Sequence, residues 1–173
     1  MAEYEKITQE FEPVYNEDSE ILILGSLPSV KSREQGFYYG HPRNRFWKVL
    51  SGLLAWKEPE TIAEKKEMLL QNHIALWDVI ASCEIKGSSD SSIRNVVPAD
   101  IPALLKETGM KKVYANGQTA GRLYKKFIQE RTGIEADVLP STSPANAAYS
   151  LERLLDEWGK GIHIPRRGRG DGL

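Results

Sequence analysis

The segment at residues 21–29 has the sequence Ile-Leu-Ile-Leu-Gly-Ser-Leu-Pro-Ser, an apolar run that ends at a Gly-Ser turn. Similar short apolar runs recur at 74–80, 112–115 and 136–139. Helically spaced segments separate them and begin near residues 44, 61, 100, 118 and 147. Because strands of a parallel sheet are buried on both faces, this alternation is typical of βαβ units. We predict a three-layer α/β/α fold with a central, mainly parallel four-stranded sheet.

The segment that follows Asn44 has the spacing of an amphipathic helix. Its apolar residues recur three and four positions apart, so we expect most of its aromatic side chains to lie in the core. Gly109 lies where another helix would need a left-handed cap. The apolar residues of the first helix are Phe46, Trp47, Leu50, Leu53 and Leu54.

The length of 173 residues and a hydrophobic content of 40% fit one globular domain, which we place at 1–164. A basic tail follows at 165–173, with the sequence Pro-Arg-Arg-Gly-Arg-Gly-Asp-Gly-Leu. The net charge is −1, so any surface for a polyanion must be local. No stretch approaches the ~18 apolar residues of a membrane span, and we expect an intracellular, soluble protein. The single cysteine, Cys83, excludes an internal disulfide framework.

Three polar segments follow the ends of predicted strands. They are Gly25-Ser-Leu-Pro-Ser29, Asn116-Gly-Gln-Thr119 and Pro140-Ser-Thr-Ser-Pro-Ala-Asn146. In an open parallel sheet, ligands bind at the carboxyl ends of the strands. A crevice lined by these segments is rich in amides and hydroxyls, which suits a neutral heterocycle or a phosphate.

The sequence does not favour a metal ion or a nucleotide cofactor, and we expect neither. The first polar segment lacks the glycine spacing of a GxGxxG motif and the lysine of a P-loop. The histidines have neither an i, i+4 partner nor a nearby cysteine pair, as zinc sites require. They are His41, His73 and His163.

The segment at 36–47 is the most informative one, with the sequence Gly-Phe-Tyr-Tyr-Gly-His-Pro-Arg-Asn-Arg-Phe-Trp. Tyr38 and Tyr39 offer flat faces between a strand and a helix, and aromatic faces hold unstacked bases. Asn44 is a good N-cap residue, so capping alone also explains it. Asp78 and Asn116 follow the second and third strands, where contacts to a base edge and turn formation are both open.

Taken together, the segments 25–29, 38–47 and 141–146 resemble the motifs of the hypoxanthine (deoxyinosine) DNA glycosylases, in the uracil-DNA glycosylase superfamily. The long His-Pro-x-Asn-x-Phe-Trp element at 41–47 is specific, and the mismatch-specific uracil-DNA glycosylase branch shares it. The resemblance extends from Phe11 to about Trp158. It implies a cofactor-independent enzyme that flips a deaminated base out of DNA and hydrolyses its N-glycosidic bond.

The resemblance also implies roles for particular residues. The mismatch-specific branch has a catalytic asparagine where this chain has Ser26, so the expected catalytic residues are Asn44 and Ser26, with Asn44 as the main one. Tyr39 matches the aromatic position that stacks on the base, while the segment 25–29 faces the flipped nucleotide. The last segment enters the minor groove, with Ala145 at the wedge position. The expected DNA contacts are Pro28, Ser29, Ser141, Ser143, Pro144, Ala145 and Asn146.

Breaking an N-glycosidic bond needs an aligned water and stabilisation of the negative charge on the departing base. The carbonyl of Asn44 could orient water, and its amide N–H could bond a base oxygen; of the two, the first is our expectation. No lysine is placed to attack the sugar, which predicts a monofunctional hydrolase. The expected partner is double- or single-stranded DNA, bound by a cytoplasmic monomer. A catalytically silent damage-binding protein and a small-molecule nucleoside hydrolase remain as alternatives.

Overall fold

The computed structural model describes residues 3–27 and 29–165. Its centre is a parallel sheet of four strands in the order β3-β2-β6-β7. The register pairs Gly25 with Asp78 and Asn116 with Leu139, so the carboxyl ends of the strands lie along one edge of the sheet. The strands are β2 (Ile21–Gly25), β3 (Ile74–Asp78), β6 (Lys112–Asn116) and β7 (Ala136–Leu139).

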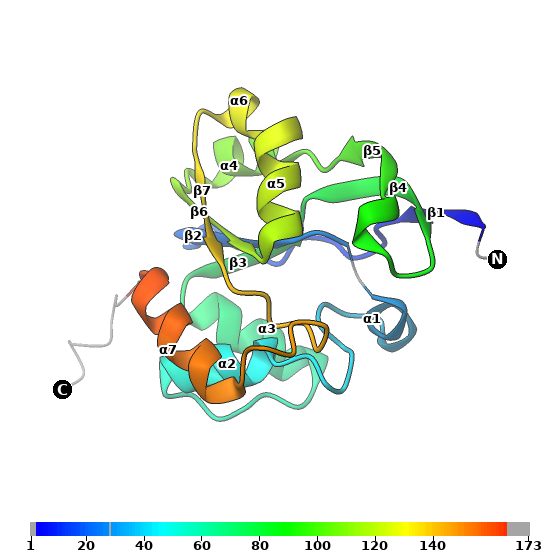
Figure 1. Cartoon of the computed structure of the whole chain (residues 1–173). Helices are drawn as coiled ribbons and strands as arrows, with labels where there is room; N and C mark the ends of the chain where they lie inside the picture. The colour runs from blue at the N-terminus through cyan, green and yellow to red at the C-terminus, as the bar shows by residue number, and fades with distance from the viewer. Residues whose placement is uncertain (1–2, 28, 166–173) are drawn as a thin grey trace.

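Helices cover both faces of this sheet, which confirms the predicted three-layer architecture. Figure 1 shows α2, α3 and α7 below the sheet and α4, α5 and α6 above it. The lower helices are α2 (Phe46–Leu54), α3 (Ile62–Gln71) and α7 (Leu151–Gly161). The upper helices are α4 (Ile101–Thr108), α5 (Gln118–Phe127) and the short α6 (Gln129–Thr132).

Strand β2 shows why its sequence is a continuous apolar run. Leu22 and Leu24 pack into the core above the sheet, whereas Ile21 and Ile23 pack into the core below it. Side chains alternate between the two faces of a strand, so a strand covered on both faces must be apolar throughout. The aromatic residues at the start of α2 are buried in the lower core, as predicted.

A second, antiparallel sheet in the order β1-β4-β5 was not predicted. The expected strand at 74–80 breaks at Val79, where the backbone N–H groups of Val79 and Ile80 donate to the carbonyls of Gly25 and Ser26. The chain then continues into β4. The strands of this sheet are β1 (Tyr4–Thr8), β4 (Ile80–Lys86) and β5 (Arg94–Pro98).

Smaller differences concern the ends of helices. The helix expected to begin at about 147 begins at Leu151, after the N-cap Ser150. The helices α1 (Val30–Gln35) and η1 (Asp90–Ser92) were not predicted. Gly109 has a φ of 74° and caps α4 in the left-handed conformation, as predicted.

No helix of the described ranges is both long and apolar enough to cross a membrane. Of the predicted basic tail, only Pro165 belongs to the described residues. The predicted DNA contact Pro28 also lies outside them.

Candidate functional site

A buried carboxyl group lies at the carboxyl edge of the parallel sheet. Asp78 ends β3 and is 3% exposed. Gln9 Nε2 donates a hydrogen bond to Asp78 Oδ2, from the segment that follows β1. Burial raises the pKa of Asp78 to about 7, and the bond from Gln9 opposes this shift in part. Asp78 therefore changes its charge near neutral pH.

Gly25 leaves the space that this carboxyl occupies. A Cβ atom on Gly25 would lie 2.6 Å from Asp78 Oδ1 and 2.7 Å from the hydroxyl oxygen of Tyr39. Both distances are shorter than real Cβ contacts, so any side chain here would displace both groups. The carboxyl and the phenol thus converge on the end of β2.

Tyr39 has two unusual features. Its φ is 54°, a left-handed conformation that is uncommon for a bulky residue and is found at functional sites. Its hydroxyl is buried and, within the described residues, has no hydrogen-bond partner of normal geometry. Burial, then the charge of Asp78, raises the pKa of Tyr39, while the neighbouring Asn116 lowers it in part. One face of the ring stacks on Phe46, with centroids 4.2 Å apart.

Tyr38 does not share this position. It is 2% exposed, and its hydroxyl donates to the carbonyl of Glu12 at 2.8 Å. Its ring packs edge-on against Phe11 and Phe37. The left-handed backbone of Tyr39 turns the chain between the two tyrosines. In this structure Tyr38 therefore belongs to the core, in contrast to the base contact expected from the sequence.

Asn44 is joined to the ends of β6 and β7 by hydrogen bonds between side chains. Its Oδ1 accepts from the backbone N–H of Phe46 at 2.9 Å and from the hydroxyl of Thr142 at 2.8 Å. Asn116 Nδ2 in turn donates to Thr142 Oγ1 at 3.0 Å. We call Asp78, Tyr39, Asn116, Thr142 and Asn44 the edge network, because each one contacts or electrostatically influences the next.

The loop at 141–146 is held by its own polar side chains. Ser141 Oγ accepts from the N–H of Ser143, and Ser143 Oγ accepts from the N–H of Ala145, each at 3.1 Å. Asn146 Nδ2 donates to the carbonyl of Ser141 at 3.0 Å. Pro144 is partly buried, whereas Ala145 is exposed at the turn of the loop. The predicted wedge residue is therefore accessible.

Hydrogen bonds from Arg45 connect this loop to the segment that contains Asn44. Its guanidinium donates to the carbonyl of Tyr149, and also to those of Ser143 at 3.0 Å and Asn146 at 3.2 Å. Its backbone N–H donates to the carbonyl of Thr142 at 3.1 Å. Sequence reasoning missed Arg45, Thr142 and Gln9, although two of them lie inside the quoted motifs.

The side chains of the segment at 25–29 form fewer hydrogen bonds than those of the loop at 141–146. Ser26 is partly buried, and its hydroxyl forms no hydrogen bond within the described residues. Ser29 caps α1, since its Oγ accepts from the N–H of Ser32 at 3.1 Å. The structure thus gives Ser29 a local role and leaves the Ser26 hydroxyl unbonded.

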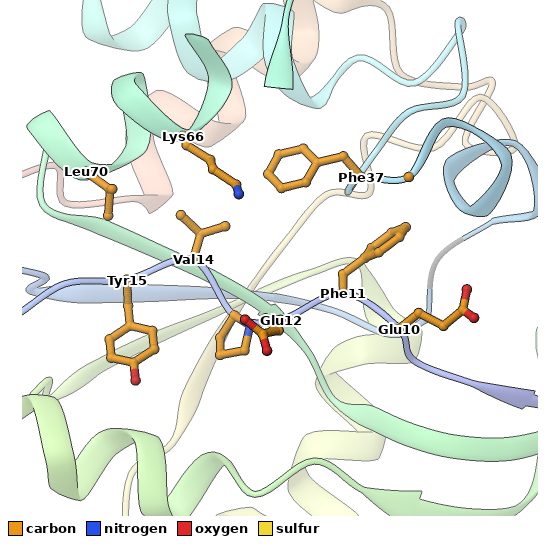
Figure 2. A pocket seen from close by; sticks show the side chains of 10 residues that line it. Glu10, Phe11, Glu12, Val14, Tyr15, Phe37, Lys66 and Leu70 are labelled. Carbon is orange, nitrogen blue, oxygen red and sulfur yellow. The ribbon is translucent and has the colours of Figure 1, made fainter. Parts of the chain in front are cut away.

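A pocket of about 380 Å³ lies away from the edge network. Figure 2 shows Lys66 and Phe37 pointing into the space between α3 and the segment at 10–15. The lining includes charged, aromatic and aliphatic side chains but none of the edge network. We do not assign the predicted base contacts to it.

Comparisons with known proteins agree on one family. The model of the uracil DNA glycosylase superfamily matches residues 12–160. A hypoxanthine DNA glycosylase from Methanosarcina acetivorans is 37% identical over 154 residues, which cover 88% of this chain and 96% of the relative. The hypoxanthine DNA glycosylase from Methanosarcina barkeri is 36% identical over 154 residues, covering 87% and 94%. The solution NMR structure of a candidate uracil DNA glycosylase from M. acetivorans superposes with a TM-score of 0.75, at 36% identity, covering 88% and 94%.

Proposed function

The chain belongs to the uracil DNA glycosylase superfamily and is a DNA glycosylase, and we propose that hypoxanthine is the base that it favours. The proposed reaction adds water to C1′ of the deoxyribose and releases the base, which leaves an abasic site. Uracil and xanthine are further candidate substrates. Both relatives named above are hypoxanthine DNA glycosylases and match nearly their whole length, which supports this choice.

One structural observation carries the proposal: hydrogen bonds join the Asn44 amide through Thr142 to Asn116, and the buried carboxyl of Asp78 lies at the same edge of the sheet. Hypoxanthine presents O6 as an acceptor and N1–H as a donor, the reverse of adenine. In the proposed complex Asn44 donates to O6, and ionised Asp78 accepts from N1–H. Adenine would leave these buried groups unpaired, at a cost of about 1 to 3 kcal/mol each.

Tyr39 is the proposed stacking partner of the flipped base. Phe46 supports one face of its ring, so the opposite face is the one that a base would contact. Asn116 ends β6 close to the hydroxyl of Tyr39 and is the second candidate for contacts to the base edge.

The loop at 141–146 is the proposed contact with the DNA around the extruded nucleotide. Ala145 is exposed at its turn and is small, which makes it a weaker wedge than a large apolar side chain. Extrusion costs a few kcal/mol and least for a mispaired base, so deaminated bases are favoured. We propose that the protein acts as a monomer in the cytoplasm, on double- or single-stranded DNA.

A panel of oligonucleotide duplexes tests the proposal. Each duplex carries one hypoxanthine, uracil, xanthine or adenine, and heating in alkali reveals abasic sites. We expect the fastest cleavage at hypoxanthine and none at adenine. Asn44→Ala should slow the reaction roughly 100- to 1,000-fold, the usual loss when one donor to a developing anion is removed.

The matched control is Gln71→Ala, which removes an exposed amide whose one hydrogen bond within the described residues is to Glu67 on α3. This variant should retain full activity. Binding of damaged duplexes without abasic sites would instead indicate a silent damage-binding protein. Faster hydrolysis of free deoxyinosine than of DNA would indicate a nucleoside hydrolase, and either result would refute the proposal.

A further inference from the structure

Thr142 is fully buried where three segments of the chain meet. Its backbone N–H donates to Asn116 Oδ1 at 3.1 Å, and its carbonyl accepts from the N–H of Arg45 at 3.1 Å. Its hydroxyl bonds Asn116 on one side and Asn44 on the other. Every polar atom of Thr142 is therefore used, although no role in the site was expected for it from the sequence.

The direction of each bond in this group follows from chemistry. The N–H of Thr142 can only donate, so the atom of Asn116 that it contacts is the amide oxygen. The amide nitrogen of Asn116 must then donate to the Thr142 hydroxyl. A hydroxyl has one proton, and the proton of Thr142 is left for Asn44.

The orientation of the Asn44 amide is fixed in the same way. The backbone N–H of Phe46 can only donate, so it identifies the accepting atom of Asn44 as the oxygen. This oxygen also receives the proton of Thr142, which uses both of its lone pairs. The amide nitrogen of Asn44 forms no hydrogen bond within the described residues, and the side chain is partly exposed.

We propose that Thr142 is a positioning residue that commits Asn44 to act through its amide nitrogen, as a donor to the base oxygen that gains charge. An oxygen already held by two donors is a poor acceptor for an attacking water. A group other than Asn44 must therefore orient that water. This inference rests on the proposed function, because it concerns the same reaction.

Thr142→Val tests the inference, because valine keeps the shape of threonine and removes the hydroxyl. Without that hydroxyl, Asn44 Oδ1 keeps one donor and Asn116 Nδ2 loses its acceptor. We expect the single-turnover excision of hypoxanthine at saturating enzyme to slow roughly tenfold to 100-fold. The affinity for the same duplex should change less than threefold, and Thr142→Ser should restore most of the rate.

A double-mutant cycle separates this role from a general loss of structure. If Thr142 acts through Asn44, Thr142→Val should add less than about twofold to the loss already caused by Asn44→Ala. The control is Thr108→Val, which removes a partly buried hydroxyl that donates to the Leu104 carbonyl in α4. This control should keep the wild-type rate.

Asn44→Asp distinguishes a donor from an acceptor. A carboxylate still accepts from Phe46 and Thr142, but it has no N–H to offer. We expect Asn44→Asp to be as slow as Asn44→Ala, whereas a residue that orients water would keep much of its activity as aspartate. An active Asn44→Asp, an unchanged Thr142→Val or additive losses in the cycle would overturn the inference alone. A wild-type protein that releases no hypoxanthine would overturn the proposed function and this inference with it.

Discussion

Two loops border the edge network, and they contribute to it in opposite ways. The first, at 25–29, contributes space, because Gly25 has no side chain and the hydroxyl of Ser26 is unbonded within the described residues. The second, at 141–146, contributes hydrogen bonds, through Thr142 and through the carbonyls that Arg45 holds. One side of the site therefore depends on the space beside Gly25, and the other side depends on fixed hydrogen bonds.

This difference has a consequence for catalysis. Donors that are held in place before the reaction stabilise a developing charge without a cost of reorganisation. In this protein such donors lie on the side of Asn44 and Thr142. The resemblance to the mismatch-specific branch would put an asparagine at Ser26, on the side that offers space. We therefore expect substitutions to act through steric conflict at the first loop and through lost bonds at the second.

Gly25→Ala should cause the largest effect among substitutions near the first loop. The new Cβ would meet Asp78 Oδ1 at 2.6 Å and the Tyr39 hydroxyl at 2.7 Å, and neither group can stay in place. Displacing these base contacts should slow excision roughly 100-fold, and overpacking should destabilise the fold by about 1 to 3 kcal/mol. Single-turnover kinetics and thermal unfolding measure the two effects.

The matched control for this prediction is Gly159→Ala in α7. Its Cβ would lie at an ordinary 3.4 Å from Leu53 Cδ2, and alanine favours a helix over glycine. Activity should be unchanged and stability equal or higher. Full activity of Gly25→Ala would show that the first loop does not act by leaving space.

Asp78→Asn should remove a dependence of stability on pH. Burial raises the pKa of Asp78 to about 7 from an ordinary value of 3.8. The unfolded chain loses this proton at lower pH than the folded protein, so the free energy of unfolding falls as pH rises between these values. The slope is at most about 1.4 kcal/mol per pH unit.

Urea denaturation at pH 5, 6, 7 and 8 checks this prediction. The wild-type protein should lose stability across this range, and Asp78→Asn should have a flatter profile and be the more stable of the two at pH 8. Asp137→Asn is the control, because Asp137 is exposed and bonds Lys112. Its profile should follow that of the wild type. Parallel profiles for wild type and Asp78→Asn would show that Asp78 is already ionised in the folded protein at pH 5.

Arg45→Met tests the bonding of the second loop. Methionine fills similar space but removes the guanidinium bonds to the carbonyls of Ser143, Asn146 and Tyr149. The carbonyls of Ser143 and Asn146 each keep a backbone N–H donor. Because water can reach part of this loop, the expected destabilisation is about 1 to 2 kcal/mol, or a melting temperature lower by roughly 2 to 8 °C. Affinity for damaged DNA should also fall.

Arg94→Met is the comparison for this change. Arg94 bonds Glu84 on the exposed antiparallel sheet, where ion pairs contribute about 1 kcal/mol or less. This variant should bind damaged DNA as the wild type does. Equal losses of DNA affinity in both variants would indicate that Arg45 contributes to DNA binding through its positive charge and not through its hydrogen bonds to the loop.

The sequence predicted the parallel sheet well because its strands are buried on both faces. Continuous apolar runs such as 21–24 then stand out from the helices between them. Strands β1 and β5 were missed because they are mostly exposed and contain polar and charged residues, not a continuous apolar run. Their pairing with β4 depends on contacts between distant parts of the chain.

The candidate site was predictable only in part. Polar residues after strand ends identified Asp78 and Asn116, because parallel strands bring their carboxyl ends to one edge. Tyr38 and Tyr39 look alike in the sequence, and only the backbone conformation of Tyr39 separates them. Thr142 contacts Asn44 across 98 positions of the chain, a contact that local pattern cannot predict.

Ser26→Ala should have the smallest effect, although the sequence suggested a catalytic role for this residue. Its carbonyl accepts from the N–H of Ile80 at 3.1 Å, and the carbonyl of Gly25 accepts from the N–H of Val79 at 2.8 Å. These backbone bonds hold the loop and survive the loss of the hydroxyl, which is unbonded within the described residues.

We expect Ser26→Ala to change the single-turnover rate less than about twofold and the free energy of unfolding by less than about 0.5 kcal/mol. The rate of Ser26→Ala is compared with that of Asn44→Ala on the same duplexes under the same conditions. A loss of tenfold or more in Ser26→Ala would show that the first loop supplies a catalytic hydroxyl as well as space. The contrast between the two loops would then hold for their structure but not for their chemistry.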